Sequence, residues 1–253
     1  MDARRLPARH GALWLLGGFA LFRRHPPLMT LLTFGYMMVV VVVNLIPKLG
    51  PFLLPLLLPA LTVVLANGCR AVERGQPFSG ANLGVGLARQ RTGLLRLGLL
   101  HLLGSAILVM ISSQLLGEPI NINDGIDPAE VTALLTDFAV ILLLASPMLM
   151  AFWFSPLLTA WDGVSAAKSL FFSFVASWRN WPAFAMYGLV VVVVGALVPG
   201  LILIVAGQIS QSLLMVLNTA LRMLLIFVLA PTLVASIYLS YRDVFAAIEA
   251  TDE

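Results

Sequence analysis

The chain has 253 residues, of which 60% are hydrophobic and only 11% are charged. A soluble globular domain carries about 25% charged residues, and it could not hide this much apolar surface, because folded proteins still expose a large area. The net charge of +3 does not indicate nucleic acid, because the basic residues flank apolar segments and form no soluble basic face. The composition therefore predicts an integral membrane protein with no nucleic-acid partner, and Cys69, as the single cysteine, excludes an internal disulfide.

The first apolar segment, residues 11–22, is preceded by arginines and followed by Arg23-Arg24-His25-Pro26. Its twelve residues are too few to cross a hydrocarbon core of about 30 Å. The alternative is a cleaved signal peptide, but no small-residue cleavage site follows the segment. We therefore predict a helix in the cytoplasmic interface of the membrane, with Trp14, Phe19 and Phe22 in contact with lipid.

Six later segments have the length and the apolar character of membrane spans, which need about 17–25 residues. These segments are residues 28–47, 53–72, 94–115, 132–156, 183–206 and 213–239. The valine runs 39–43 and 190–194 lack the alternation of barrel strands. The sequence therefore predicts an all-α polytopic membrane protein with six transmembrane helices, forming one membrane domain over residues 1–253.

Lysine and arginine are distributed unevenly between the two sides of the predicted spans. One side holds 13 of the 15 basic residues: Arg4, Arg5, Arg9, Arg23, Arg24, Arg70, Arg74, Arg89, Arg91, Arg96, Lys168, Arg179 and Arg242. The other side holds only Lys48 and Arg222, and its longest loop, residues 117–131, is acidic. Because short cytoplasmic loops carry the excess of basic residues, we predict that both termini lie in the cytoplasm of a bacterial cell, with the chain in the inner membrane.

The chain also has the pattern of an internal repeat, in which an amphipathic interfacial helix precedes a helical hairpin. The three units would be residues 10–78, 79–162 and 163–248. Tyr36 and Tyr187 each stand shortly before five valines, and in two units an arginine follows a proline after eleven residues. These pairs are Pro59 with Arg70 and Pro231 with Arg242. Such units would be related about the membrane normal, unlike inverted transporter repeats.

Prolines stand inside the second helix of each unit, at Pro59, Pro147 and Pro231. Each removes a backbone donor and frees a carbonyl group one turn earlier, so we predict kinks at these positions. Kinks either line a transport pathway or shape helix packing, and packing is the more frequent reason.

Ionisable side chains inside apolar spans are costly and often functional. Asp137 and Arg222 lie at similar depth near the outer ends of the fourth and sixth spans, so we predict an ion pair that holds the two helices together. A substrate or proton site is the alternative. His101 lies about one turn inside the third span, where we expect a hydrogen-bonded packing residue rather than a haem ligand.

The search for catalytic chemistry is negative. No group of His, Cys and carboxylate residues has metal-ligand spacing. The sequence Gly84-x-Gly86-x-x-Arg89 lacks the third glycine and the preceding strand of a dinucleotide site. We therefore expect no catalytic residue, no metal and no cofactor.

Basic and aromatic residues at the inner ends of the spans are candidates for contact with anionic lipid headgroups or with a partner protein. These candidates are Arg23, Arg24, Arg89, Arg91, Lys168, Arg179, Trp178 and Trp181. The pattern of residues 166–175, a segment that includes Lys168, predicts an amphipathic helix. Its apolar stripe includes Ala166, Phe171 and Phe174.

Several motifs support a family resemblance. They are Trp14 to Phe22 with Pro26, Cys69 to Pro77, Phe154-Ser155-Pro156, Ser173 to Trp181, and Tyr238 to Phe245. Through them the chain resembles, over essentially its full length, an uncharacterised family of six-helix inner-membrane proteins of proteobacteria. Residues 173–180 also resemble the membrane-anchor domain of bacterial glycerophosphodiester phosphodiesterases, but this sequence contains no hydrolase domain. The resemblance implies the location and the fold, and it implies no activity.

The leading functional interpretation is a non-enzymatic scaffold, assembly factor or organiser of the lipid environment, in contact with membrane lipids and other inner-membrane proteins. Its basis is that polar residues gather at the inner ends of the spans. The alternative is a small carrier or channel for lipid or an apolar solute. A carrier built on the repeat needs a polar residue at matching depth in each unit, and Asn44, Asn67 and His101 do not clearly match. A membrane-bound enzyme is the third possibility.

Overall fold

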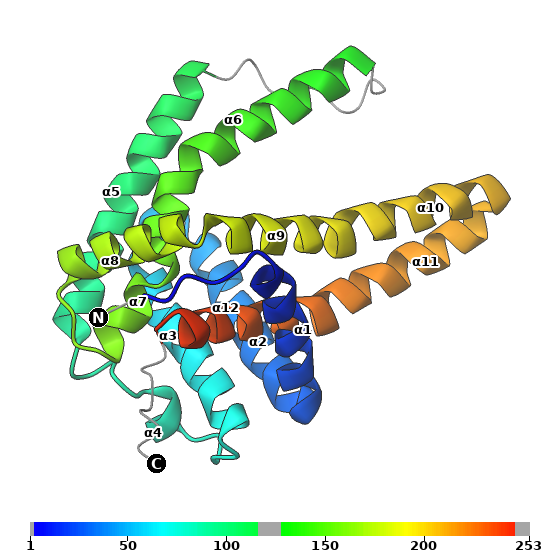
Figure 1. Ribbon diagram of the computed structural model, residues 1–253. Coiled ribbons are helices and arrows are strands. Elements are labelled where there is room, and N and C mark those ends of the chain that lie inside the picture. Colours follow the sequence, from blue (N-terminus) through cyan, green and yellow to red (C-terminus); the bar gives the residue numbers. More distant parts are fainter. Residues whose placement is uncertain (1–2, 116–127, 246–253) are drawn as a thin grey trace.

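The computed structural model describes residues 3–115 and 128–245, and its regular structure over those ranges is helical (Figure 1). The α-helices are α1 Arg9–Arg24, α2 Pro26–Asn44, α3 Gly50–Glu73, α4 Gly80–Leu83, α5 Arg91–Leu115, α6 Pro128–Trp153, α7 Ser155–Ala160, α8 Ala166–Arg179, α9 Trp181–Val192, α10 Val198–Ile209, α11 Gln211–Leu224 and α12 Ala230–Phe245. Two π-helical turns, η2 Val193–Leu197 and η3 Leu225–Leu229, join α9 to α10 and α11 to α12.

Six helical stretches in these ranges are long and apolar enough to cross a membrane, which confirms the six predicted spans. The fifth comprises α9, η2 and α10, and the sixth comprises α11, η3 and α12. Most of the acidic loop predicted at residues 117–131 lies outside the described residues. The division into three repeated units stays a prediction.

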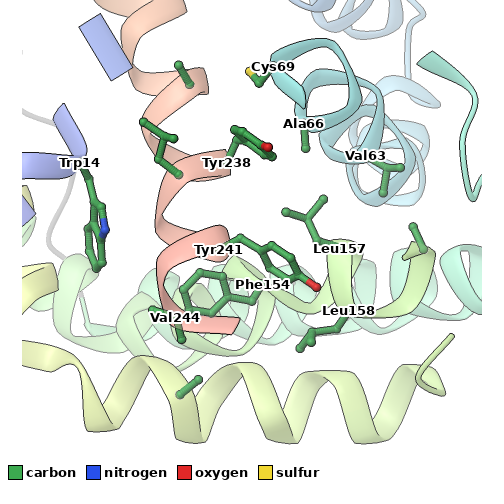
Figure 2. Packing of buried hydrophobic residues seen from close by; sticks show 14 of the residues in the cluster. Trp14, Val63, Ala66, Cys69, Phe154, Leu157, Leu158, Tyr238, Tyr241 and Val244 are labelled. Atoms are coloured by element: carbon green, nitrogen blue, oxygen red, sulfur yellow. The ribbon is translucent and has the colours of Figure 1, made fainter. Parts of the chain in front are cut away.

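The long helices diverge from one packed region, which we call the hub (Figure 1). The α5–α6 pair extends away in one direction and the α10–α11 pair in another, while α2 packs against α3. The hub is formed by α1, α7, α8, α9, α12 and the C-terminal part of α3. Figure 2 shows α12 in the middle of the buried cluster, with Trp14 on one side and Val63 and Ala66 of α3 on the other.

Helix α1 lies between α9 and α12 because two of its glycines let the backbones approach closely. A Cβ atom at Gly11 would lie 2.1 Å from the carbonyl oxygen of Ala183 in α9. A Cβ atom at Gly18 would lie 2.5 Å from the carbonyl oxygen of Thr232 in α12. Small residues at helix contacts are the usual device by which helices associate in membranes, where hydrophobicity alone does not select a partner.

This packing corrects the interpretation of α1 as a helix that dips its aromatic side chains into lipid. Trp14 is 1% exposed and Phe22 is 7% exposed, so both contact protein, and only Phe19 is exposed. The Trp14 ring contacts the rings of Phe184 and Tyr187 in α9. The helix itself was predicted correctly, but its apolar face is part of the core of the hub.

The carbonyl groups freed by two of the predicted prolines accept hydrogen bonds from hydroxyl groups. Pro231 leaves the Phe227 carbonyl without its usual helical donor, and the Thr30 hydroxyl of α2 donates to it at 3.3 Å. Pro147 does the same to the Leu143 carbonyl, to which the Ser146 hydroxyl donates at 2.8 Å. Hydroxyl side chains and local π turns, such as η3 just before Pro231, are how membrane helices tolerate proline.

Helix α8 buries small and hydroxyl-bearing residues and exposes aromatic ones. Ser169, Ser173 and Ser177 are buried one turn apart, whereas Phe171 is exposed. The Ser173 hydroxyl donates to the Met150 carbonyl at 2.8 Å and accepts from the Phe154 amide at 2.9 Å. These bonds satisfy the backbone at the break between α6 and α7. A helix therefore forms over residues 166–175, and its serine face meets the protein, while its amphipathic role at the membrane interface stays a prediction.

Candidate functional site

An open cavity of about 410 Å³ lies where α3 and α12 end and where the loops before α5 and after α7 meet. We call it the arginine vestibule. Its lining residues are Arg70, Arg74, Val85, Arg89, Ala160, Trp161, Asp162, Tyr238, Tyr241, Arg242 and Phe245. Four guanidinium groups thus share one cavity with a single lining carboxylate.

The end of α3 positions the first two arginines. Gly75 has φ +62°, a conformation that favours glycine, and the chain reverses there. The Gly75 amide donates to the Val72 carbonyl at 3.3 Å and the Gln76 amide to the Ala71 carbonyl at 2.9 Å, which is the Schellman pattern that closes a helix. Arg70 precedes Arg74 by one helical turn, so both project on the same side toward the vestibule.

The carboxylates around the vestibule are engaged by neighbouring donors. The Tyr238 hydroxyl and the Arg242 guanidinium both donate to the Glu73 carboxylate. The Tyr241 hydroxyl donates to the Asp162 carboxylate. Both tyrosines come from α12, whose side chains Figure 2 shows within the buried cluster. The contacts therefore fix the carboxylates against α12.

Asp243 forms a further link behind the vestibule. Its carboxylate accepts from Arg242 Nη2 at 3.1 Å and from Trp14 Nε1 at 3.2 Å. Arg242 is thus bound between two carboxylates, those of Glu73 and Asp243. Arg242 joins α12 to α3 through Glu73, and Asp243 joins α12 to α1 through Trp14, so both residues have a structural role in the hub.

The other three arginines of the vestibule have no carboxylate partner among the described residues. The Arg70 guanidinium lies over the Trp161 ring, 5.2 Å from its centroid. Arg89 Nη2 donates to the Trp161 carbonyl at 3.5 Å, a long bond. Arg74 is exposed. These three side chains leave hydrogen-bond donors free toward the cavity.

Asn67 holds the wall of the vestibule in place and is buried. Its Oδ1 atom accepts from Trp161 Nε1 at 2.9 Å, and its Nδ2 atom donates to the carbonyls of Leu83 and Val85, each at 2.9 Å. The side chain of one residue therefore fixes both the Trp161 ring and the loop that carries Arg89.

Asn180 does the same for the N-terminal segment. Its Oδ1 atom accepts from the Leu6 amide at 2.8 Å, and its Nδ2 atom donates to the carbonyls of Arg4 and Ala176, each at 2.9 Å. The Arg4 amide donates to the Val244 carbonyl at 2.9 Å. Residues 4–6 are therefore bound to the ends of α8 and α12.

A second cavity, of about 360 Å³, lies between α3, α5, α6 and α12 and is mostly apolar. His101 and Thr62 are the polar residues in its lining. The His101 ring lies edge-on to Phe152, with 4.7 Å between the ring centroids, and its Nδ1 atom is 3.5 Å from the Ser105 hydroxyl. The structure therefore places His101 at a cavity, and its role as a packing residue stays a prediction.

The predicted ion pair between Asp137 and Arg222 does not form. Both residues are described, and neither takes part in the salt bridges of the structure. Asp137 is on α6, which packs against α5, α7 and α8, whereas Arg222 is on α11, which packs against α10 (Figure 1). The pairing prediction is wrong because similar depth in the membrane does not make two helices neighbours.

The predicted contact residues for lipid or partner are all exposed: Arg23, Arg24, Arg89, Arg91, Lys168, Arg179, Trp178 and Trp181. Only Arg89 lies in the vestibule, and Arg24 donates to the Glu73 carbonyl at 3.2 Å nearby. No three His, Cys, Asp or Glu residues in the described ranges group as metal ligands would. Contact of these exposed residues with lipid headgroups or with a partner protein stays a prediction.

Sequence reasoning did not identify the vestibule as a site, although it singled out several of its residues. Arg70 and Arg242 were matched as equivalent ends of two repeats, and both line the vestibule. The spacing of Arg70 and Arg74, and of Tyr238 and Arg242, by one helical turn was the available signal.

Comparison with known proteins places the chain in the bacterial inner membrane. A probable inner membrane protein of Burkholderia thailandensis is 32% identical over 206 residues, which cover 75% of this chain and 75% of that protein. No protein-family model matches the chain, and no solved structure matches it. With its six candidate spans, the chain is a multi-pass membrane protein that belongs to the family of this inner membrane protein of Burkholderia.

Proposed function

We propose that the protein is a non-enzymatic component of the inner membrane that organises the lipids or the membrane proteins around it. One observation carries the proposal: the long helix pairs diverge from the hub and leave large apolar faces uncovered (Figure 1). Within the described ranges, at most 39% of the most apolar stretch of any of the six spans is buried. Lipid tails or other transmembrane helices must cover side chains such as Leu143 of α6, which is 72% exposed.

The chemistry of the hub supports a structural role. Asn67 and Asn180 each make three hydrogen bonds, and the two tyrosines of the vestibule donate to carboxylates. Groups engaged in this way stabilise one arrangement of helices, because a buried polar group that loses its partner costs about 1–3 kcal/mol. A rigid hub with uncovered apolar helix pairs is suited to contacts with lipid and other helices.

Helix α8 is proposed to lie along the cytoplasmic interface of the membrane. Its serine face packs on the hub, and its outer face carries Phe171 and Trp178, both exposed. Lys168 and Arg179 flank this face and are exposed too. Basic residues next to anionic headgroups contribute about 1 kcal/mol each, and aromatic side chains favour the interface.

The orientation that we propose places both termini and the basic loops in the cytoplasm. Support comes from the 13 of 15 basic residues on that side. Reporter fusions after Glu73, Lys168 and Glu253 are expected to report the cytoplasm, and fusions after Asp124 and Gln208 the periplasm. A periplasmic signal at Lys168 would contradict the arrangement.

Purification from native membranes tests the proposed function. We expect the protein, extracted with the lipids that surround it, to be enriched in anionic lipids or in specific inner-membrane proteins relative to the bulk membrane. The bilayer-spanning helix of an unrelated protein, extracted identically, is the control. A lipid and protein content equal to that of the control would contradict the proposal.

A carrier for lipid or an apolar solute is the second candidate, favoured by the apolar cavity of about 360 Å³ beside His101. Its size lies within the range of about 300–1,000 Å³ that small-molecule sites occupy. Vesicles that contain the purified protein separate the two functions. The leading proposal expects no faster exchange of fluorescent lipid between leaflets than in protein-free vesicles, whereas a carrier would accelerate it.

A further inference from the structure

We propose that the arginine vestibule binds a phosphate group, held by Arg70, Arg74 and Arg89. The phosphate is carried either by the headgroup of a phospholipid in the cytoplasmic leaflet or by a soluble phosphorylated compound. The inference deepens the proposed function, because it names the chemical group that the hub would hold at the inner surface of the membrane.

The charge of the vestibule favours an anion. Among the described residues, four guanidinium groups line the cavity against one carboxylate, that of Asp162. Arg242 is paired with Glu73 and Asp243 outside the lining, which leaves three arginines without an acidic partner in the described ranges. Like charges held around one cavity repel each other, and a bound anion removes that repulsion.

The geometry of the donors suits a phosphate group. A guanidinium group presents parallel N–H donors that match two oxygens of a phosphate. The Arg70 guanidinium lies over the Trp161 ring, and among the described residues none accepts a hydrogen bond from it, so its donors remain available to a ligand. Asn67 fixes the Trp161 ring by accepting a hydrogen bond from its indole N–H. Arg70 is half-buried, so water screens the charge of its guanidinium group less than at an open surface.

The vestibule is also large enough for a headgroup. Its volume of about 410 Å³ exceeds what a bare phosphate needs and falls within the usual range for small ligands. The hydroxyl groups of Tyr238 and Tyr241 already donate to carboxylates and are not available to the ligand. The arginines therefore carry the recognition, and the phosphate is the group that they fit.

The test measures binding to the full chain in neutral detergent micelles at about 0.15 M salt. The probes are short-chain phosphatidic acid, short-chain phosphatidylglycerol, inorganic phosphate and glycerol 3-phosphate, with a neutral diacylglycerol of the same acyl length as the control for chain binding. We expect the double variant Arg74→Gln/Arg89→Gln to weaken binding by about tenfold or more, because it removes two charges and their charge-assisted hydrogen bonds to the phosphate.

The matched control is Arg5→Gln/Arg9→Gln, which removes two exposed arginines that lie outside the vestibule and are not among the predicted headgroup contacts. It is expected to change affinity by less than about twofold, as for exposed charges. If the double variant does not fold, Arg74→Gln alone serves, because this side chain is exposed and has no ion-pair partner within residues 3–115 and 128–245.

The comparison of lipid and soluble probes distinguishes the source of the phosphate. Binding of the anionic lipids alone identifies a headgroup site, and comparable binding of glycerol 3-phosphate or inorganic phosphate identifies a soluble ligand. Affinities that the vestibule variant leaves unchanged, or that the control variant lowers equally, would overturn the inference. Lipid enrichment around the diverging helices does not depend on the vestibule, so this failure would be distinct from failure of the proposed function.

Discussion

Alanine at Gly11 or at Gly18 is expected to separate α1 from the hub and to lower the stability of the protein. The added Cβ atom would lie 2.1 Å from a backbone oxygen of α9 at Gly11 and 2.5 Å from a backbone oxygen of α12 at Gly18. Backbone atoms cannot rotate away as a flexible side chain can, so the helices themselves must move. Overpacking of this kind costs about 1–3 kcal/mol at each site.

Thermal unfolding in detergent measures the effect, with the double variant Gly11→Ala/Gly18→Ala as the strongest case. Gly35→Ala in α2 is the matched control, because nothing lies within 4 Å of the Cβ atom that it adds. There alanine is expected to be neutral or slightly stabilising, since it favours helix by about 1 kcal/mol over glycine. If the double variant Gly11→Ala/Gly18→Ala and the control Gly35→Ala unfold at the same temperature, α1 is not held between α9 and α12 by close backbone contact.

The six spans could be predicted because their signal is local. A helix that crosses the membrane must contain an uninterrupted apolar stretch, and each such stretch is visible in the sequence without knowledge of its neighbours. The prolines within them were equally readable, and the freed carbonyls of Leu143 and Phe227 accept hydrogen bonds as the chemistry requires.

The partners of each helix could not be predicted in the same way. Lipid tails are as apolar as leucine, so an apolar side chain does not indicate whether it faces protein or lipid. Trp14 was therefore assigned to lipid although it is buried, and Asp137 and Arg222 were paired although they lie on separate helix pairs. Small and hydroxyl-bearing residues would have been the better guide.

The vestibule could not be predicted because the residues that line it are distant in the sequence. Arg70 and Arg74 end one span, Arg89 belongs to a loop, and Trp161 follows a break after another span. Each reads as one more basic or aromatic residue at an inner interface, where such residues are common. Only the convergence of α3, α7 and α12 shows that three of the arginines share a cavity and have no acidic partner in the part of the chain that the structure describes.

Replacement of Asn67 by leucine is expected to destabilise the wall of the vestibule more than any other single polar change there. Leucine fills a similar space but leaves the Trp161 indole N–H and the carbonyls of Leu83 and Val85 without their partner. Each buried group left unpaired costs about 1–3 kcal/mol, so the three together would lower the free energy of unfolding by several kcal/mol. The change is expected to lower the unfolding temperature and to expose the loop around Leu83 to protease.

Two further variants show whether the loss comes from these hydrogen bonds. Asn44→Leu makes the same change at an exposed asparagine that only donates to the Val40 carbonyl of its own helix, and it should leave stability nearly unchanged. Asn67→Asp keeps the acceptor for the Trp161 indole but places a carboxylate against the two carbonyls, so it should free the loop while Trp161 stays bound. Because the chain has five tryptophans, the emission lost when Trp161→Phe is added to each variant reports the Trp161 ring, and proteolysis reports the loop. The two readouts should therefore separate in Asn67→Asp and change together in Asn67→Leu. If Asn67→Leu behaves like Asn44→Leu in both readouts, the side chain of Asn67 does not hold the wall of the vestibule.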